Sequence, residues 1–421
     1  MSSEWPIKRL GDCCEKIGSG ATPKGGKDSY QNKGSIYLIR SQNIYNEGFK
    51  SSGLVFINED QAKKLNNVSV KAGDVLLNIT GDSVARVCQA LNEFIPARVN
   101  QHVAIIRPNP TKLDARFLRY YLASPAQQGL MLSLASAGAT RNALTKVMIE
   151  AFEIPCPSLE VQIQIAEVLG LLDSRITLFK ETNKTLESIS QAIFKSWFID
   201  FDLVKNKTVK NDQKGVGDAI NKIFPSTFIE SSIGLIPEGW RVGLLGEEVK
   251  IAYGKNLPTT KLHSSGFPVY GGNGIIGFYN KYIYEARQLL VACRGAASGK
   301  INQSSPMAFV TNNSLVLESG DLSFLPFGYL KGYMLNSDLT PYVTGSAQPQ
   351  VTIENLKSFK ILVPDENVLR EYENISKVIE DRIDLNNEQM QILSDIRNTL
   401  LPRLMSGQLK PQNVALESIE I

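Results

Sequence analysis

The sequence predicts two α/β (α+β) globular units separated by a long antiparallel two-helix coiled coil, with a pseudo-twofold internal repeat. Three observations predict this fold. The chain is similar to itself over most of its length, the last part of each repeat carries an apolar heptad pattern, and the earlier part alternates short β-rich runs with turns. At roughly 150 residues per domain, a chain of 421 residues is expected to form two or three domains.

The internal repeat is clearest around the two heptad segments. Residues 138–198 match residues 345–405 at a constant offset of 207 without a gap. Near the two starts, Trp5–Gly11 (WPIKRLG) resembles Trp240–Gly246 (WRVGLLG) at an offset of 235. The ends of the repeats match while their interiors diverge, which indicates a duplicated scaffold whose middle has changed.

The globular units are predicted at residues 1–157 and 233–364. Short β-rich runs such as Ile36–Ile39 and Asp74–Leu77 are separated by Gly, Asn and Pro, which mark turns. A helical stretch is expected at Asp114–Ala123. These patterns predict mixed α/β units but give no strand order.

Each repeat ends in a predicted long helix, at 158–200 and at 365–406. Apolar residues recur at heptad spacing along both segments, as in the seam of a coiled coil. The first seam contains Ile165, Leu169, Leu172, Ile176, Phe179, Leu186, Ile193 and Trp197, and the second contains Tyr372, Ile379, Ile383, Met390, Leu393, Leu400 and Leu404. Polar residues interrupt the seams at Asn183, Ser190, Asn386 and Arg397. At 1.5 Å per residue the first helix would be roughly 60 Å long.

Capping residues bound the two helices. Ser158 and Asp365 are the expected N-caps, and Gly407 is the expected stop of the second helix. The first helix leads away from the first unit and enters the second through a linker at 201–232, which contains a polar stretch rich in Lys and Asn. The second helix must then run back, so the pair is predicted to be antiparallel. A C-terminal tail at 407–421 follows.

The composition is that of a globular protein, with 43% hydrophobic and 21% charged residues. No apolar run is long enough to span a membrane and no secretory signal opens the chain, so we expect no membrane contact. Five cysteines without a C-x-x-C pair make a disulfide framework or zinc site unlikely and fit a reducing cytoplasm. The net charge of +3 permits nucleic-acid binding without requiring it.

Two conspicuous motifs have a plain structural interpretation. Gly272–Gly277 reads G-x-G-x-x-G, but the β- or loop-like Phe278–Tyr282 follows it where a dinucleotide fingerprint needs a helix. We therefore interpret it as a turn-rich loop or hairpin. His102 and His263 are the only histidines, and no cysteine or second histidine lies near either in the sequence, so both are predicted to be structural.

The order of unit, long helix, unit and long helix resembles the specificity subunits of type I restriction-modification enzymes. The resemblance covers nearly the whole chain. Its most recognisable pieces are the segment Pro237–Trp240, the step Ile154–Pro157 into the first helix and the tail Leu400–Gly407. Trp5 and the loop Gly18–Pro23 also resemble the family. No single motif decides the resemblance; the order of the parts does.

The resemblance implies a non-catalytic subunit with two target recognition domains, each of which reads one half of a split site in double-stranded DNA. The long helices would hold the domains apart and dock two methyltransferase subunits, through which restriction and translocation subunits join the complex. S-adenosylmethionine, ATP and Mg²⁺ would be bound by these partners, and no cofactor or metal by this chain.

Candidate DNA contacts are polar and basic residues in the loops of both units, because Arg, Lys, Asn and Gln suit base edges and phosphates. In the first unit they are Ser19, Thr22, Lys24, Arg40, Gln42, Asn43, Arg86, Arg98 and Arg141. In the second unit they are Lys255, Asn273, Arg294, Lys300, Asn312, Asn313, Gln348 and Gln350. The loops with Arg141 and with Gln348 and Gln350 directly precede the long helices, so we rank them above other polar loops.

Two other classes of function, an enzyme acting on DNA and a coiled-coil interaction scaffold, fit the sequence less well. A DNA adenine methyltransferase would need an Asn/Asp-Pro-Pro-aromatic stretch, and Asn109-Pro110-Thr111 lacks both the second proline and the aromatic residue. A nuclease would need a cluster of metal-binding acids, and we find no plausible one. A coiled-coil interaction scaffold would explain the seams but not two globular units with divergent interiors.

Overall fold

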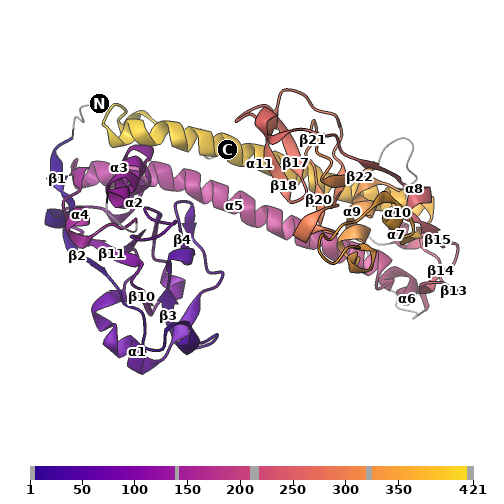
Figure 1. Ribbon diagram of the computed structural model, residues 1–421, viewed down its shortest axis with the longest axis horizontal. Helices are drawn as coiled ribbons and strands as arrows, with labels where there is room; N and C mark the ends of the chain where they lie inside the picture. Colours follow the sequence, from indigo (N-terminus) through magenta and orange to yellow (C-terminus); the bar gives the residue numbers. More distant parts are fainter. Residues whose placement is uncertain (1–4, 138–141, 209–217, 319–324, 415–421) are drawn as a thin grey trace. The chain divides into compact units, whose positions relative to one another are not determined.

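The computed structural model describes residues 5–137, 142–208, 218–318 and 325–414 (Figure 1). Its contacts divide the chain into two compact units, residues 1–179 with 388–421 and residues 180–387. Each unit contains a head of strands and short helices together with part of each long helix.

The head of the first unit contains two four-stranded sheets. The first is antiparallel and has the order β2 (Cys14–Ser19), β11 (Val103–Pro108), β8 (Val75–Asn78) and β9 (Val87–Gln89). The second has the order β6 (Val55–Ile57), β3 (Ile36–Ile39), β10 (Ala97–Val99) and β7 (Ser69–Val70), and within it only β3 and β10 are parallel. The predicted β-rich runs are confirmed as β3 and β8.

Short elements complete this head. A two-stranded ladder pairs β1 (Ile7–Arg9) with β12 (Glu153–Pro155), and a hairpin pairs β4 (Ile44–Tyr45) with β5 (Gly48–Phe49). The helices are α1 (Glu59–Lys64), α2 (Ala115–Ala123), α3 (Pro125–Ser136) and α4 (Lys146–Glu150). The predicted helical stretch is α2, and Asp114 caps it by accepting from the N–H groups of Arg116 and Phe117.

The head of the second unit has corresponding sheets. Its antiparallel sheet has the order β16 (Lys250–Tyr253), β22 (Ser314–Glu318), β19 (Leu289–Ala292) and β20 (Ile301–Gln303). Its second sheet has the order β18 (Gly274–Tyr279), β17 (Phe267–Gly271) and β21 (Phe309–Val310), with β17 and β21 parallel. The ladder of β15 (Arg241–Leu244) and β23 (Lys360–Val363) matches that of β1 and β12.

Further elements of the second unit join the long helix to this head and cover it. They are α6 (Asp202–Thr208), α7 (Asp218–Ile223), β13 (Phe228–Ser231), β14 (Gly234–Pro237), α8 (Leu245–Glu248), α9 (Phe327–Leu335) and α10 (Ile353–Lys357). The predicted linker at 201–232 therefore contains two short helices and a strand, and residues 209–217 lie outside the described ranges.

The inner strands are buried on both faces. In β8, Val75 and Leu77 join the core that packs toward the long helices, while Leu76 joins the core between the two sheets. In β19, Leu289 joins the core that packs toward the long helices, and Leu290 joins the core between the two sheets. Since side chains alternate across a strand, a strand covered on both faces appears in the sequence as a continuous apolar run.

The two long helices are α5 (Leu159–Phe198) and α11 (Glu366–Met405), with 40 residues each. In the first unit, the start of α5 shares a core with the end of α11, which contributes Leu401 and Leu404. In the second unit, Phe194 and Trp197 near the end of α5 share a core with Tyr372 near the start of α11. Within each unit the two helices are therefore antiparallel.

The predicted helix boundaries hold to within two residues. The Val161 N–H donates to Ser158 Oγ at 3.5 Å, and the Asn367 N–H donates to Asp365 Oδ1 at 2.8 Å, so both expected N-caps act as caps. Gly407 adopts a φ of +81° just beyond α11, which is a left-handed conformation that stops a helix. Of the predicted tail, residues 415–421 lie outside the described ranges.

The candidate nucleic-acid interface

One hairpin turn has the same backbone hydrogen bonds in both heads. Between β8 and β9, the Asn78 N–H donates to the Arg86 carbonyl at 2.8 Å, and the Ala85 N–H donates to the Asn78 carbonyl at 2.9 Å. Between β19 and β20, Ala292, Lys300 and Gly299 make the same two bonds, each at 2.9 Å. Arg86 and Lys300 therefore occupy the same position in equivalent turns, and each brings a positive charge there.

A glycine brings a second loop against the end of the outer strand of each antiparallel sheet. A Cβ atom added to Gly20, which follows β2, would lie 1.7 Å from the carbonyl oxygen of Val99. A Cβ atom added to Gly254, which follows β16, would lie 2.2 Å from the carbonyl oxygen of Thr311. Only glycine allows the backbones to approach so closely. The loops at 99–102 and 310–313 are held in place by this contact.

The loop before each long helix closes the same end of the head. In the first unit, the Leu144 N–H donates to the Ile79 carbonyl at 2.8 Å. In the second unit, the Val351 N–H donates to the Cys293 carbonyl at 3.1 Å. Isolated bridges pair Thr80 with Ala143 and Arg294 with Gln350. We call these surfaces the first edge (residues 19–20, 78–86, 99–102 and 142–144) and the second edge (residues 253–255, 292–300, 310–313 and 349–351).

The first edge carries a chain of polar side chains. Thr80 Oγ1 and His102 Nδ1 are 2.5 Å apart, and Gln101 Nε2 and His102 Nε2 are 2.8 Å apart. His102 was predicted to be structural, but it is half-exposed on this edge between two polar neighbours. The signal that could have found it is its position in the repeat, because Asn100 and Gln101 align with Thr311 and Asn312.

The second edge gathers most of the residues predicted for the second unit. Lys255, Arg294, Lys300, Asn313 and Gln350 are exposed on it, and Asn312 is half-exposed. Lys300 Nζ donates to Asn273 Oδ1 at 2.5 Å, which brings the β17–β18 turn to the same edge. Gln348 is exposed in the adjoining loop. The edge therefore combines three cations with amide side chains, the groups that bind phosphates and base edges.

The residues predicted for the first unit are more dispersed. Ser19 and Arg86 belong to the first edge. Arg40 Nη2 and Gln42 Nε2 both donate to the Gly53 carbonyl, at 2.5 and 3.2 Å. Lys24 lies beside α1, where its carbonyl accepts from Gln61, and Thr22 is exposed nearby in the sequence. Arg141 lies outside the described residues.

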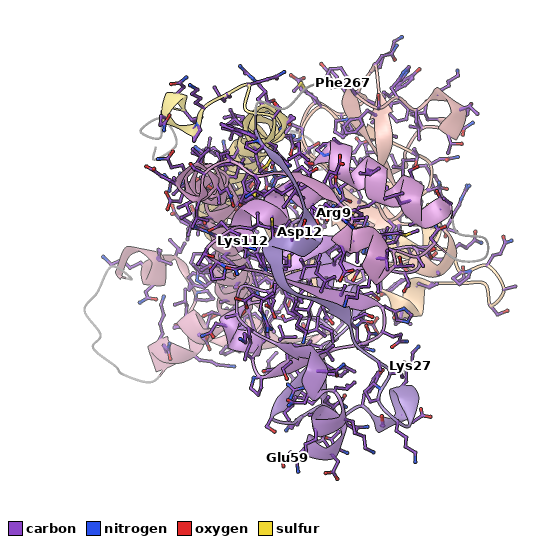
Figure 2. The ribbon with its side chains drawn as sticks, turned by 90° about the vertical axis from the view of Figure 1, so that its left-hand side faces the viewer. Arg9, Asp12, Lys27, Glu59, Lys112 and Phe267 are labelled. Carbon is purple, nitrogen blue, oxygen red and sulfur yellow. The ribbon has the colours of Figure 1, made fainter. Side chains whose placement is uncertain are left out.

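Figure 2 shows where this outer part of the head lies. Lys27 and Glu59 mark the 3-10 helix after Lys24 and the start of α1, and they lie at the end of the head away from Lys112 and Asp12. Lys112 Nζ donates to the Asp12 carbonyl at 3.0 Å close to the start of α5. Lys24, whose carbonyl accepts from Gln61 on α1, therefore belongs to the outer end of the head rather than to its helix-proximal end.

Two residues predicted to contact DNA make hydrogen bonds within the head instead. Asn43 is fully buried, and its amide group donates to the carbonyls of Lys50 and Ser52. The Arg98 guanidinium donates to the Ala62 and Ala97 carbonyls and to Asn66, and burial lowers the pKa of Arg98. Their sequence positions beside polar turns suggested DNA contacts, but neither side chain is free to make them.

A second cationic cluster adjoins the first edge. Lys50 Nζ lies 3.8 Å from the centre of the Tyr45 ring, and the Arg86 guanidinium lies 4.7 Å from it. Two cations close to one aromatic ring concentrate positive charge at this surface, and concentrated positive charge attracts anions. Lys50 was missed in the sequence because a single exposed lysine carries no signal.

The long helices carry an exposed apolar stripe. In the first unit it consists of Leu171 and Leu178 on α5 and of Ile392 and Ile396 on α11. In the second unit it consists of Ile189 on α5 and of Val378 and Leu385 on α11, and Val378 is 70% exposed. Three pairs share the repeat offset of 207: Leu171 with Val378, Leu178 with Leu385, and Ile189 with Ile396. Both repeats therefore leave the same apolar positions uncovered.

No group of three or more His, Cys, Asp or Glu side chains that could hold a metal ion occurs among the described residues. The helices within the described ranges also include none with the length and apolar character that crossing a bilayer requires.

The chain is similar in sequence to one known protein family. The sequence model of the type I restriction modification DNA specificity domain matches it twice, at residues 2–188 and 237–395. The chain belongs to the type I DNA specificity family. Its members are recognition subunits without catalytic activity, so the enzyme alternatives are set aside.

Relatives of this specificity family match over the full length. The MjaIX specificity subunit of Methanocaldococcus jannaschii is 26% identical, over 98% of this chain and 95% of the relative. The HindI specificity subunit of Haemophilus influenzae is 22% identical, over 97% of this chain and all of the relative. The crystal structure of the type I S subunit from M. genitalium covers 96% of each chain with a TM-score of 0.58 and 18% identity, so it shares the fold.

Proposed function

We propose that each unit reads one half of a bipartite site in double-stranded DNA, through the first edge and the second edge respectively. One observation carries this proposal: the two edges have the same backbone hydrogen bonds but different side chains. Thr80, Gln101 and His102 on the first edge stand where Arg294, Asn312 and Asn313 stand on the second. The same backbone arrangement with different polar side chains would allow the two units to read different bases.

Under this proposal the cationic side chains contribute affinity for DNA, and the amide side chains recognise the base sequence. Arg86, Lys50, Lys255 and Lys300 neutralise phosphates, which position the duplex without reading it. Arg294 suits guanine, and the amide side chains suit adenine. Of the other predicted contacts, Ser19, Asn273, Gln348 and Gln350 remain in the proposed interface. Arg40, Gln42, Thr22, Lys24 and Arg141 stay sequence-based predictions of DNA contacts.

We further propose that α5 and α11 form a coiled-coil spacer related by the internal repeat, and that its length sets the unread gap between the half-sites. The heptad seams and the burial of Ile165, Leu169, Leu172 and Ile176 support the spacer. The shared strand order of the two heads supports the duplication.

The exposed stripe is the proposed docking surface for two methyltransferase subunits. It recurs at matching repeat positions, so the same partner segment can bind once per repeat. An amphipathic helix laid along the stripe would bury apolar area that the described helices leave open. Restriction subunits would join through this complex in the cytoplasm, and S-adenosylmethionine, ATP and Mg²⁺ would bind to the partners.

The recognition function is tested by co-expressing the chain with its neighbouring methyltransferase subunit and mapping methylated positions across a genome. We expect a two-part motif with an unspecified middle of constant length. A single continuous motif, or methylation without sequence preference, would contradict the proposal.

The docking surface is tested separately with Leu178→Glu and Leu385→Glu in one chain. Charges in the stripe should abolish co-purification with the methyltransferase subunit and leave the circular dichroism spectrum unchanged. The matched control, methionine at both positions, keeps the stripe apolar and should bind normally. Undiminished binding by the glutamate variant would place docking elsewhere.

A further inference from the structure

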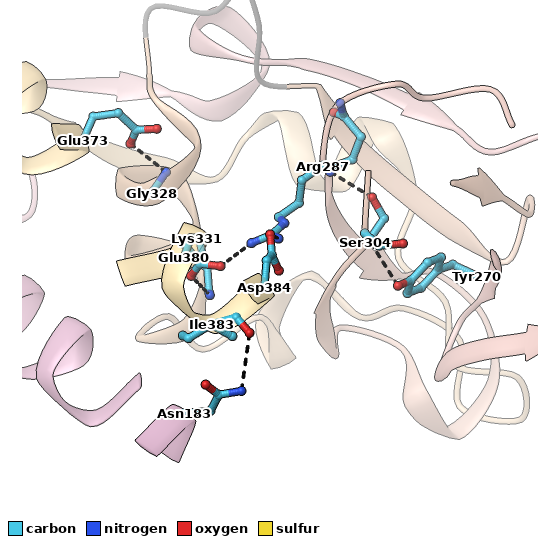
Figure 3. Close-up of polar contacts among 12 residues, drawn as sticks. Asn183, Tyr270, Arg287, Ser304, Gly328, Lys331, Glu373, Glu380, Ile383 and Asp384 are labelled. Carbon is cyan, nitrogen blue, oxygen red and sulfur yellow. Dashed lines mark hydrogen bonds and ion pairs between the residues drawn. The ribbon is translucent and has the colours of Figure 1, made fainter. Parts of the chain in front are cut away.

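A buried acid on α11 receives two cations from the head of the second unit. Glu380 is 7% exposed, and Lys331 on α9 and Arg287 before β19 both form ion pairs with it (Figure 3). Arg287 also pairs with Asp384, one turn further along α11. The guanidinium thus spans two acids of the long helix, and the lysine fixes a second point of the head to it.

The first unit has a counterpart on α5. Asp173 accepts from Arg119 Nη1 at 2.8 Å and from the Tyr120 hydroxyl at 2.9 Å, both on α2. Arg397 on α11 donates to its other oxygen at 2.8 Å. Burial opposes ionisation of Asp173, but the charge of Arg119 and the hydrogen bonds from Arg397, Arg119 and Tyr120 outweigh it and lower its pKa.

The two contacts occupy equivalent positions in the repeat. Asp173 and Glu380 are related by the offset of 207, and Phe117-Leu118-Arg119 on α2 matches Tyr329-Leu330-Lys331 on α9. The acids differ in length and so do the bases, yet each head pairs a cation of its covering helix with an acid of a long helix. The pairing is kept while the residues change, which points to a role for the contact itself.

Open space lies beside each contact, at the border of the apolar core through which α2 and α9 pack on the long helices. A cavity of about 300 Å³ beside Lys331 and Glu380 is lined by residues of β19, β20, α9 and both long helices. An open groove of about 680 Å³ lies beside Arg119 and Asp173, between α2, the β4–β5 hairpin and α5. Each ion pair therefore adds a charged link between the head and its long helix at the edge of an open space, beside the apolar contacts that the same helices make.

We propose that Asp173–Arg119 and Glu380–Lys331 are positioning contacts that fix each head on the spacer and so restrict the accepted gap between half-sites. This inference rests on the proposed function. One added base pair turns a half-site by about 34° and moves it by about 3.4 Å. A head that can rock on its helix would tolerate that change, whereas a pinned head would not. Leaving one partner of a buried pair uncompensated is costly, so the pair holds its geometry.

The test uses the complex with methyltransferase subunits and a set of duplexes that carry both cognate half-sites at the cognate gap and at one base pair more or less. We expect Asp173→Asn and Glu380→Gln, singly and together, to reduce the preference for the cognate gap about tenfold, the effect of one lost partly buried contact. Base preference within each half-site should not change. Lys331→Arg keeps the pairing and should retain the gap preference.

Matched controls separate positioning from general stability. Glu318→Gln removes a 2.7 Å ion pair with Lys250 that lies wholly within the second head, so the gap preference should persist. Lys331→Met is a milder second variant, because Glu380 keeps Arg287 and the head stays folded; it should also broaden the gap. Variants that fold and discriminate gaps like the wild type would overturn this inference. A wild-type complex without gap preference would instead overturn the proposed function.

Discussion

The substitution Gly20→Ala tests the edge at its tightest point. The added Cβ atom would lie 1.7 Å from the Val99 carbonyl oxygen, and real Cβ contacts stay beyond 3.0 Å. The obstacle is backbone, so the segment at Gly20 and the loop at 99–102 must separate by more than 1 Å. This separation changes the position of Gln101 and His102 relative to the rest of the edge. One good bidentate base contact is worth about 1–3 kcal/mol. Its loss should weaken binding about 5- to 150-fold.

The assay is fluorescence anisotropy of the methyltransferase complex on duplexes with both half-sites, or with one half-site scrambled. Gly20→Ala should lose discrimination at one half-site only and keep it at the other, which also shows that the chain is folded. Gly18→Ala, two residues earlier in β2, is the matched control, because its added Cβ meets no atom within 4 Å. Wild-type affinity and discrimination in the Gly20→Ala variant would refute the assignment of the first edge.

Two further predictions concern stability. Because the pKa of Asp173 is lowered in the folded state, its contribution to the unfolding free energy is present above its usual pKa of 3.8 and is lost as the pH falls through the folded-state value. Urea unfolding between pH 6 and pH 3 should show this loss, and Asp173→Asn should flatten it; parallel profiles would contradict the assignment. Asn386 is fully buried and donates to Asn183 Oδ1 at 2.7 Å, so replacing both residues with leucine should leave the unfolding free energy equal or higher while loosening the gap preference. A large loss of stability would show that this pair holds the helices together.

The long helices were predictable because their pattern is local. Heptad spacing, an N-cap and a left-handed glycine each act within a few residues, so α5 and α11 begin and end within two residues of their predicted bounds. The β-rich runs were predictable for the same reason. Strand order was not, because pairing β8 with β11 joins residues far apart in the chain and leaves no periodic trace.

The candidate site residues were also predictable only where a local sequence pattern marks them. Lys255, Arg294 and Lys300 could be predicted to lie in loops because short polar runs mark turns, and the structure brings these turns of the second head to one edge. Asn43 looks the same in sequence, but its amide closes a loop of the fold. His102 was predicted to be structural because a lone histidine belongs to no motif. Only the alignment of the two repeats shows that it is equivalent to Asn313.

We propose that the two long helices set the distance between the two DNA recognition units. Removing one heptad from α5 and the facing heptad from α11 shortens the spacer by about 10 Å, or about three base pairs at ~3.4 Å each. Methylome mapping of the shortened complex should return the same two half-sites with a gap about three base pairs shorter. The same half-sites at an unaltered gap would mean that something other than the helices sets the spacing.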